Sequence, residues 1–304
     1  MLSGEKVLVT GAAGRVAFPI ARELAKQNEV HGMARFSSPA DREKLQQAGI
    51  KTIRKDIGRD TFDDVPSDFT YVFHAAALVT REAERDWRYT FEVNAQAAGR
   101  LLHHCRNAKG FVHCSTGSQY QYQGHRPLKE SDPPGIHTHN YSLSKIAAEA
   151  VVTWVARQYD IPAAIIRICS TYGPTGGAPA NRLDLMVQGK EVPLHPDKPN
   201  YFNPIYEDDY VEFGIKALTL AQTPPLVVNW AGSETVSAEE YCQYMADLLG
   251  IEARFRYTDE AYTPLWPDIT FMHQVLGRTK VHWKDGMRRM VQARYPDRPL
   301  RQPE

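Results

Sequence analysis

The sequence has no long apolar run, no net charge and few cysteines, and each absence narrows the classes of protein it can belong to. No hydrophobic stretch approaches the ~20 residues that cross a bilayer, so we expect no membrane partner. Lysine and arginine together number 36, as do aspartate and glutamate, which gives no sign of a nucleic-acid partner. The four cysteines stand far apart without the spacing of metal ligands. We therefore expect reduced, buried thiols and no metal site.

The sequence also shows no charged-then-apolar leader, no internal repeat and no low-complexity segment. We therefore expect a cytoplasmic protein. A length of 304 residues suits one large α/β domain with an attached lobe.

Short apolar runs alternate with helical patterns through the first half of the sequence. The predicted strands are Lys6–Thr10, Glu29–Met33, Lys51–Arg54, Tyr71–Ala75, Gly110–Cys114 and Ala163–Ile168, and Leu226–Trp230 is expected to rejoin them. Helices are predicted over Trp87–Cys105, after Asn140, over Ser237–Gly250 with a capping box, and over Met287–Ala293. Such alternation predicts an α/β protein with a Rossmann-type, doubly wound parallel sheet.

The alternation stops after Tyr172-Gly-Pro174, where a loop rich in glycine and proline begins. We predict that residues 1–170 form an NAD(P)-binding Rossmann domain, to which residues 203–232 return. Residues 171–202 and 233–304 then form a smaller, mostly carboxyl-terminal substrate-binding lobe. Substrates of open α/β folds bind at the carboxyl ends of the strands, where we expect this lobe.

A glycine-rich turn follows the first predicted strand directly. Gly11 and Gly14 allow a tight turn and the close approach of a pyrophosphate. Arg15 and Val16 lead into a helix whose amino terminus stabilises negative charge. Ala17 stands at the third glycine position, where a small residue is enough for helix–strand packing. Strand, turn and helix together predict a dinucleotide-binding βαβ unit.

The end of the second predicted strand bears on the choice between the two nicotinamide dinucleotides. An NAD site usually has a carboxylate ~20 residues beyond the glycines, which accepts a hydrogen bond from the ribose 2′-hydroxyl. This sequence has Ala34 and Arg35 there, followed by Ser37 and Ser38. A cation and hydroxyl groups suit a 2′-phosphate, and Arg15 could join them. We therefore predict NADP(H) in preference to NAD(H).

A phenol and an ammonium group stand four residues apart at Tyr141 and Lys145. Residues at this spacing share one face of a helix, and the following Ile146–Ala150 favours helix formation. A neighbouring cation favours the phenolate form of tyrosine. The pair therefore suits proton transfer to or from an alcohol or ketone oxygen.

Together these motifs resemble those of the extended short-chain dehydrogenase/reductase family, also called the NAD-dependent epimerase/dehydratase family. The resemblance covers nearly the whole chain. It rests on Thr10-Gly-Ala-Ala-Gly14, Asp56-Ile57, His74-Ala-Ala-Ala77, Val93-Asn94, Cys114-Ser-Thr116, Tyr141-x-x-x-Lys145, Arg167 through Tyr172-Gly-Pro174, and Tyr206-Glu-Asp-Asp209.

The resemblance implies a role for each matching residue. Tyr141 is then the catalytic acid/base, and Lys145 lowers its pKa and binds the nicotinamide ribose. Thr116 hydrogen-bonds the reacting oxygen, with Ser115 as the alternative hydroxyl. The residues implied at the cofactor are Asp56 and Ile57 at the adenine, Ala75, Ala76 and Ala77 along its path, Asn94 near the active site, and Ile168 beside the nicotinamide.

Two positions depart from the family members that act on nucleotide-diphosphate sugars. Those enzymes commonly have an asparagine where this chain has Ser170, and an arginine for the diphosphate where it has Phe202. Arg182 or Lys190 could supply the cation, but their spacing does not require it. Sugar dehydratases place an Asp-Glu pair where this chain has Gly117-Ser118, so we do not expect dehydration.

The remaining candidate residues are aromatic or lightly polar, which suits a small carbonyl or alcohol. They are Gln119, His137, His139, Tyr172, Phe202, Tyr206 and Trp266. Tryptophan and tyrosine in a small lobe are as readily explained as core residues. The two histidines lack the carboxylate or thiol that would complete a metal site.

We therefore expect an NADP(H)-dependent oxidoreductase that interconverts a carbonyl and an alcohol on a small non-nucleotide substrate. One alternative is a nucleotide-sugar 4-epimerase that recycles its cofactor. Another is a non-catalytic NADP(H)-sensing regulator. The family also implies a homodimer that pairs helices 87–105 and 140–157, with Val151, Val152 and Val155 as the apolar face.

Overall fold

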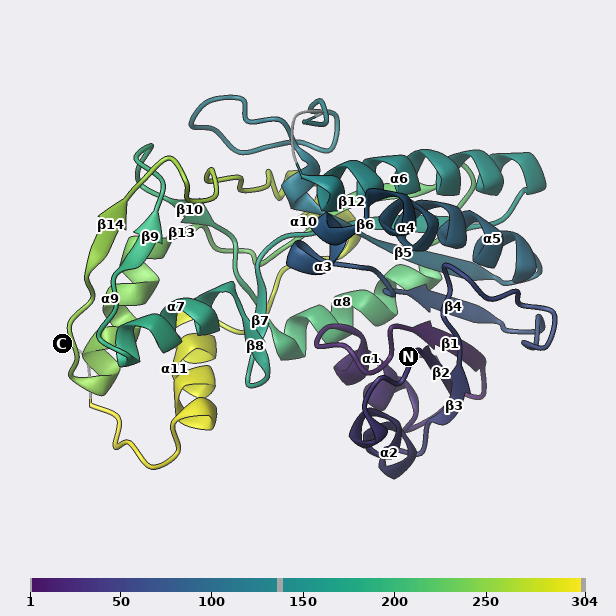
Figure 1. The fold of residues 1–304 in the computed structure, drawn as a ribbon, viewed down its shortest axis with the longest axis horizontal. Coiled ribbons are helices and arrows are strands. Elements are labelled where there is room, and N and C mark those ends of the chain that lie inside the picture. Colours follow the sequence, from purple (N-terminus) through teal and green to yellow (C-terminus); the bar gives the residue numbers. More distant parts are fainter. Residues whose placement is uncertain (1, 136–138, 302–304) are drawn as a thin grey trace. The chain divides into compact units, whose positions relative to one another are not determined.

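A computed structural model describes residues 2–135 and 139–301 of the chain. Its largest sheet has seven strands in the order β12-β6-β5-β4-β1-β2-β3 (Figure 1). These strands are β1 (Lys6–Thr10), β2 (Glu29–Ala34), β3 (Lys51–Arg54), β4 (Tyr71–His74), β5 (Gly110–Thr116), β6 (Ala163–Ile168) and β12 (Leu226–Trp230). The pairs β1–β2, β1–β4, β2–β3 and β4–β5 are parallel. Every predicted strand is therefore present.

Helices cover both faces of this sheet, as expected for a doubly wound fold. Figure 1 shows α1 (Ala17–Leu24) and α8 (Glu207–Thr219) on one face, and α5 (Ala97–His104) and α6 (Asn140–Tyr159) on the other. Val7, Leu8 and Val9 of β1 are fully buried, which is typical of a parallel strand covered on both sides. The α/β fold class and the Rossmann-type sheet are confirmed.

The predicted single helix over Trp87–Cys105 is wrong in its middle. The structure has α4 (Trp87–Phe91), a π-helix (Glu92–Gln96) and then α5. The π-helix carries Asn94, whose fully buried side chain bonds to groups outside the helix. A π-helix is rare, and its one extra residue changes the spacing of apolar residues only slightly. The sequence therefore still predicts one continuous helix. Two further helices, α2 (Pro39–Gln47) and α3 (Thr80–Arg85), complete this part of the chain.

The three valines expected to face a second copy of the chain pack inside the protein instead. Val152 and Val155 are buried in the core between helices α5 and α6, and Val151 packs against this core. A Cβ added to Gly99 of α5 would lie 2.5 Å from Val151 Cγ1, so the glycine allows the two helices to approach. From the sequence alone, an apolar helix face looks the same whether the core of its own chain or a second copy of the chain covers it.

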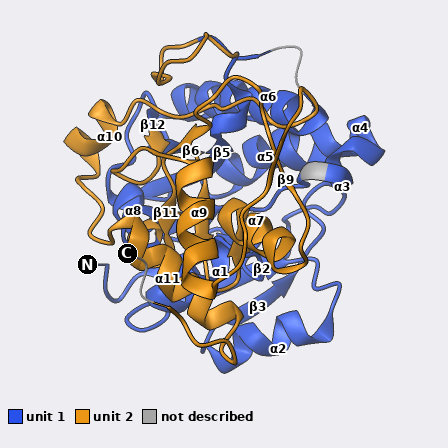
Figure 2. Cartoon of the chain, turned by 90° about the vertical axis from the view of Figure 1, so that its left-hand side faces the viewer, with its two compact units in different colours: residues 1–121, 133–167, 211–228 blue, residues 122–132, 168–210, 229–304 orange. Residues whose placement is uncertain are grey.

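The chain divides into two compact units, which Figure 2 colours separately. Unit 1 comprises residues 1–121, 133–167 and 211–228, and unit 2 comprises residues 122–132, 168–210 and 229–304. The assignment of the cofactor to residues 1–170 and of the substrate to the later lobe stays a prediction.

Unit 2 consists of helices with small sheets. Its helices are α7 (Ala178–Val187), α9 (Ala238–Leu249), α10 (Thr270–Val275) and α11 (Trp283–Arg294), and its strands are β7 (Thr171–Gly173), β8 (Gly176–Gly177), β9 (Val192–Leu194), β10 (Tyr201–Phe202), β11 (Ile205–Tyr206), β13 (Val236–Ser237) and β14 (Phe255–Tyr257). The predicted capping box at α9 is confirmed, because Ser237 and Glu240 each bond the other's backbone N–H. Helix α11 begins four residues earlier than the predicted Met287.

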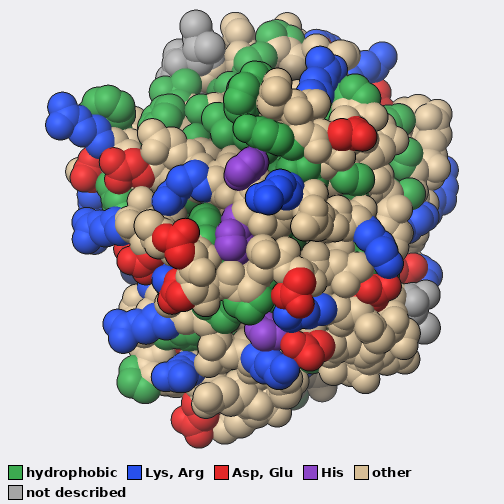
Figure 3. All heavy atoms as spheres, turned by 90° about the vertical axis from the view of Figure 1, so that its right-hand side faces the viewer, with side chains coloured by type: hydrophobic (Ala, Val, Ile, Leu, Met, Phe, Trp, Pro, Cys, Tyr) green, Lys and Arg blue, Asp and Glu red, His purple; other side chains and the backbone are tan. Residues whose placement is uncertain are grey.

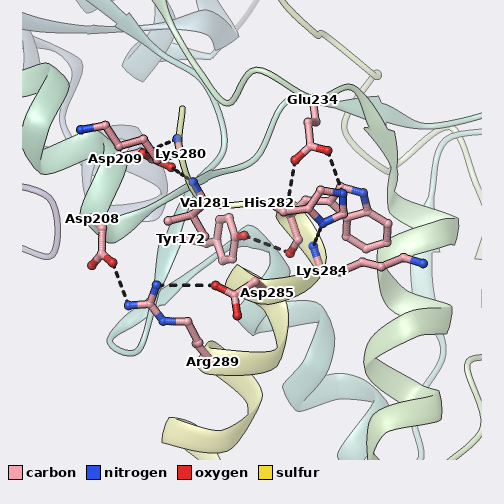
Figure 4. A network of polar contacts seen from close by, with 11 residues as sticks. Tyr172, Asp208, Asp209, Glu234, Lys280, Val281, His282, Lys284, Asp285 and Arg289 are labelled. Carbon is pink, nitrogen blue, oxygen red and sulfur yellow. Dashed lines mark hydrogen bonds and ion pairs between the residues drawn. The ribbon is translucent and has the colours of Figure 1, made fainter. Parts of the chain in front are cut away.

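Polar contacts hold α11 and the residues just before it to the start of α8 (Figure 4). The Asp209 carboxylate accepts hydrogen bonds from the backbone N–H groups of Lys280 and Val281, at 2.8 and 3.0 Å. Arg289 of α11 lies between Asp208 and Asp285, with its nearest nitrogens 2.8 and 3.8 Å from their oxygens. Asp208 and Asp209 of the Tyr206-Glu-Asp-Asp209 motif thus join two segments of unit 2 that lie far apart in the sequence.

On the face drawn in Figure 3, basic and acidic side chains are intermixed. Within residues 2–135 and 139–301, no helix has both the length and the apolar character needed to cross a bilayer. All four cysteines are buried as free thiols.

Candidate active site

The glycine turn after β1 has the geometry that a dinucleotide-binding turn requires. Gly11 has a φ of +64°, and a Cβ there would lie 2.9 Å from the backbone N and Cα of Ala76. Only glycine fits such a conformation and such close contact. The Thr10 hydroxyl, 3.2 Å from Ala76 N, accepts its hydrogen bond and so joins the turn to the Ala75–Ala77 segment. Val16 is the N-cap residue of α1, and Gly14 and Arg15 are exposed.

Tyr141 and Lys145 lie one turn apart on α6, in unit 1. Lys145 is 2% exposed, and the Tyr141 phenol forms a hydrogen bond with Thr116. Burial raises the pKa of Tyr141, and the bond from Thr116 acts in the opposite direction. The structure thus brings the three predicted catalytic side chains to one place, but in the protein alone the pKa of Tyr141 lies above its ordinary value.

Hydroxyl groups continue from Thr116 towards the start of α6. Thr116 Oγ1 lies 2.9 Å from Ser118 Oγ, which lies 3.2 Å from Ser142 Oγ. Ser115 Oγ is buried and has no hydrogen-bond partner among the described residues. Thr116, and not the alternative Ser115, is therefore the hydroxyl beside Tyr141.

Two buried histidines beneath Lys145 were not singled out from the sequence for any role. His113 Nε2 lies 3.2 Å from Lys145 Nζ, and the rings of His113 and His74 are 5.4 Å apart. His74 Nδ1 lies 2.7 Å from Thr10 Oγ1. Burial lowers the pKa of His74 to about 3 and that of His113 well below its usual value, with Lys145 adding to both shifts. Neutral imidazoles therefore lie beside the lysine, where an acceptor can bind its ammonium group.

The pKa of Lys145 leads to a prediction about stability. Burial lowers it to about 8, below the ~10.4 of an unfolded lysine. The cost of burying the ammonium is thus fully present below about pH 8 and disappears above about pH 10.4. Between about pH 7 and about pH 10, the unfolding free energy of the wild-type protein should rise by about 2 kcal/mol relative to that of Lys145→Met. Urea unfolding of both proteins measures this difference, and a pH-independent difference would contradict the burial of the charge.

The predicted adenosine end of the cofactor site contains an ion pair. Arg35 Nη2 lies 2.9 Å from Glu82 Oε1, on the short helix α3. Asp56 accepts hydrogen bonds from the hydroxyl of Tyr89 at 2.5 Å and from the backbone of Gly58 at 3.1 Å, and Ile57 is buried. Arg35 is thus paired with a carboxylate that the sequence did not indicate as its partner.

Asn94 has all of its side-chain groups bonded inside unit 1. Its Nδ2 donates to Leu78 O and to Ser144 Oγ, both at 2.9 Å, and its Oδ1 accepts from Leu78 N at 2.8 Å. Asn94 therefore joins the segment after β4 to the helix that carries Tyr141 and Lys145.

Gln119, predicted to line the substrate pocket, belongs to a buried polar cluster. Its Nε2 donates to Glu149 Oε1 at 2.6 Å. Glu149 also forms a two-pronged ion pair with Arg167, at 3.0 and 2.8 Å, and Arg167 donates to the hydroxyl of Tyr120. Glu149 lies on the same helix as Tyr141, and it was not singled out from the sequence.

The other predicted pocket residues lie mostly in unit 2. Tyr172 and Tyr206 are buried in the core of that unit with their rings 5.4 Å apart, and Trp266 is buried against His125. Phe202 is half-buried at the end of β10. His139 is the exposed residue before α6, and Ile168 ends β6. His137 lies outside the described residues. The role of these residues as a substrate pocket stays a prediction.

Comparisons with known proteins agree with this fold. YtcB of Bacillus subtilis (strain 168), described as an uncharacterized UDP-glucose epimerase, is 26% identical over 302 residues, which span 89% of this chain and 92% of YtcB. The structure of UDP-glucuronic acid 4-epimerase from Bacillus cereus in complex with UDP-glucuronic acid and NAD matches with a TM-score of 0.82 and 23% identity, over 96% of this chain and 99% of that chain. UDP-N-acetylglucosamine 4-epimerase from Methanobrevibacter ruminantium M1 matches with a TM-score of 0.84 and 19% identity, over 97% and 100% of the two chains.

The family assignment rests on the model of the NAD dependent epimerase/dehydratase family, which matches residues 7–230. That range contains the glycine turn at Gly11, the Thr116 strand end and the Tyr141–Lys145 pair. The chain belongs to the NAD dependent epimerase/dehydratase family.

Proposed function

We propose that the protein is a nucleotide-sugar 4-epimerase that uses NAD(H) and returns it to its starting state in each cycle. The observation that carries this proposal is the hydrogen-bonded pair Tyr141–Thr116 beside the buried Lys145. The relatives named as UDP-sugar epimerases support the epimerase over the net oxidoreductase on a small non-nucleotide substrate that the sequence favoured. A non-catalytic sensor is disfavoured because the whole catalytic set is retained.

The residues of unit 1 divide the chemistry between them. A nicotinamide dinucleotide held at the Gly11 turn and by Lys145 would supply reversible hydride transfer, by which the sugar carbon is oxidised to a ketone and reduced again. Tyr141 takes the proton of the sugar hydroxyl as the ketone forms and gives it back as the alcohol forms again. Thr116 hydrogen-bonds the same oxygen, and Lys145 supplies a positive charge that favours the phenolate form of Tyr141. The proton and the hydride are both restored, so no reductant is consumed.

The choice of NAD(H) replaces the expected preference for NADP(H). That preference depended on Arg35 being available to a 2′-phosphate, and in the structure Arg35 is paired with Glu82. The Bacillus cereus epimerase is described with NAD. The tight approach of Gly11 to Ala76 supports binding of either dinucleotide, since both contain the same pyrophosphate.

We propose that Arg182 of unit 2 supplies the diphosphate-binding cation that the sequence lacks at Phe202. The guanidinium of Arg182, on α7, lies 4.9 Å from the centre of the Phe202 ring, and it donates a hydrogen bond to the Tyr241 hydroxyl. No carboxylate among residues 2–135 and 139–301 forms an ion pair with it. Arg182 thus offers its charge where nucleotide-sugar enzymes of this family have arginine in place of Phe202.

Loss of this cation should weaken the binding of a nucleotide diphosphate. We expect Arg182→Gln to raise the Kd for UDP by about tenfold to a hundredfold, because a charge-assisted hydrogen bond contributes about 1.5–3 kcal/mol. Isothermal titration calorimetry measures the Kd. The matched control is Arg254→Gln, which removes a half-exposed arginine of the same unit. An unchanged Kd in Arg182→Gln would exclude a role for Arg182 in diphosphate binding.

One further candidate function has a specific observation in its favour. Ser170 and Phe202 replace two residues that commonly contact nucleotide-sugar substrates in this family. A net oxidoreductase acting on a small non-nucleotide alcohol or carbonyl is therefore the second candidate.

One experiment separates the two candidate functions. The purified protein is incubated with NAD+ and UDP-glucose, UDP-glucuronic acid or UDP-N-acetylglucosamine, and with NADH or NADPH and a panel of ketones and aldehydes. The proposed epimerase forms the 4-epimer with no net change in nicotinamide absorbance. Steady oxidation of NADH or NADPH by a ketone, with no epimer formed, would replace the proposal by the second candidate.

We also propose that the protein is a homodimer. The argument depends on exposed aromatic side chains and not on Val151, Val152 and Val155, which are covered by the protein's own core. Trp87 of α4 and Trp154 and Tyr159 of α6 are exposed to 58%, 62% and 47%, although large aromatic side chains are normally covered. They lie on the two helical segments expected to pair across a two-fold axis. Light scattering tests this proposal, and the mass of a monomer would contradict it. The cytoplasmic location stays a prediction.

A further inference from the structure

The carboxyl ends of β2 and β3 hold a connected set of charged and polar side chains in unit 1. Arg35, directly after β2, donates to Glu82 of α3 at 2.9 Å and also interacts with Tyr89. The Tyr89 hydroxyl donates to Asp56, two residues after β3. Strands β1 to β4 are parallel, so Arg35 and Asp56 follow strand ends at the same edge of the sheet as the Gly11 turn. The adenosine ribose of a dinucleotide binds at that edge.

This edge contains both of the groups that distinguish NAD from NADP sites. An NAD site has a carboxylate that accepts a hydrogen bond from the ribose 2′-hydroxyl, and an NADP site has an arginine for the 2′-phosphate. The chain has no carboxylate at the end of β2. Glu82, which is 47 residues from Arg35 in sequence, is nevertheless brought into contact with that arginine.

We propose that Glu82 determines cofactor specificity, by neutralising Arg35 and supplying the carboxylate that selects NAD(H) over NADP(H). This inference rests on the dinucleotide binding in the proposed function. The ion pair itself adds little to stability, because its side chains are 43% and 45% exposed. The effect on specificity is larger, because a phosphate bound beside Arg35 would also lie beside the Glu82 charge. Like charges a few ångströms apart repel strongly enough to alter affinity by about tenfold.

The deciding measurement is the ratio of the dissociation constants for NAD+ and NADP+. We expect Glu82→Gln to shift this ratio towards NADP+ by about tenfold or more, because Arg35 is freed and the repulsion is removed. Glu43→Gln removes the same charge from an exposed position on helix α2 and is the matched control. Isothermal titration calorimetry on the full chain gives both constants without requiring any activity.

A second pair of variants tests whether Glu82 acts through Arg35. Arg35→Gln combined with Glu82→Gln should lose the gain in NADP+ affinity, because the phosphate then has no cation. A ratio that is the same in the wild type and in Glu82→Gln would overturn the inference while leaving the proposed function intact. Failure of the wild-type protein to bind either dinucleotide would overturn the proposed function and the inference together.

Discussion

Replacing Tyr141 by phenylalanine should lower kcat by about a hundredfold to ten-thousandfold while leaving the Kd for NAD+ within about twofold. The substitution removes only the hydroxyl that we propose exchanges the substrate proton, and general acid–base catalysis contributes rate factors of this size. The ring still fills its position against the core of unit 1. Steady-state kinetics with the converted UDP-sugar give kcat, and calorimetry gives the Kd.

A neighbouring hydroxyl provides the control for this variant. Ser115 Oγ is buried without a hydrogen-bond partner among the described residues, so Ser115→Ala should retain most of the activity. The kcat of Thr116→Val should lie between those of Tyr141→Phe and Ser115→Ala, because Thr116 bonds to Tyr141 but does not hold the transferred proton. Full turnover in Tyr141→Phe would remove Tyr141 from the mechanism.

The largest effect on stability is expected at Glu149. Its carboxylate and the guanidinium of Arg167 are 13% and 12% exposed and are joined by two hydrogen bonds, at 3.0 and 2.8 Å. Glu149→Ala leaves the arginine charge buried without its partner, which typically costs about 3–5 kcal/mol. It also removes the acceptor of Gln119. Urea unfolding followed by circular dichroism measures the change in the free energy of unfolding.

An exposed ion pair gives the matched comparison. Glu23 and Lys26 are 41% and 63% exposed, and Glu23→Ala should change the free energy of unfolding by less than about 1 kcal/mol. If Glu149→Ala also had so small an effect, Arg167 would have to find another anion or reach water. The contrast therefore tests burial of the ion pair and not its mere presence.

The sheet could be predicted because its signals are local. Lys6–Thr10 and Ala163–Ile168 are short apolar runs whose strand character does not depend on distant residues, and the Gly11 turn follows its strand at once. The spacing of Tyr141 and Lys145 likewise depends only on the geometry of one helix. These features place the two predicted catalytic side chains on one helix face without reference to the rest of the molecule.

The features that could not be predicted depend on contacts between distant parts of the chain. The partner of Arg35 is 47 residues away in sequence, and His113 approaches Lys145 only because β5 lies beneath α6. The apolar pattern of Val151, Val152 and Val155 is the same whether a partner or the protein's own core covers it. The aromatic character of Tyr172 and Tyr206 suited a pocket and a core equally well, and only the structure shows that their rings pack against each other in the core of unit 2.

The π-helix at Glu92–Gln96 sets a limit on how this chain can change in length. Each residue of a helix turns the next by about 100°, so one extra residue rotates everything before it relative to everything after it by about that angle. Deleting a single residue there would restore regular helix geometry. It would also swing Tyr89 away from Asp56, or else turn Leu101 and Leu102 out of the core. A loop elsewhere can gain or lose a residue at little cost. In this helix, the contact of Tyr89 with Asp56 and the burial of Leu101 and Leu102 both depend on the number of residues between them.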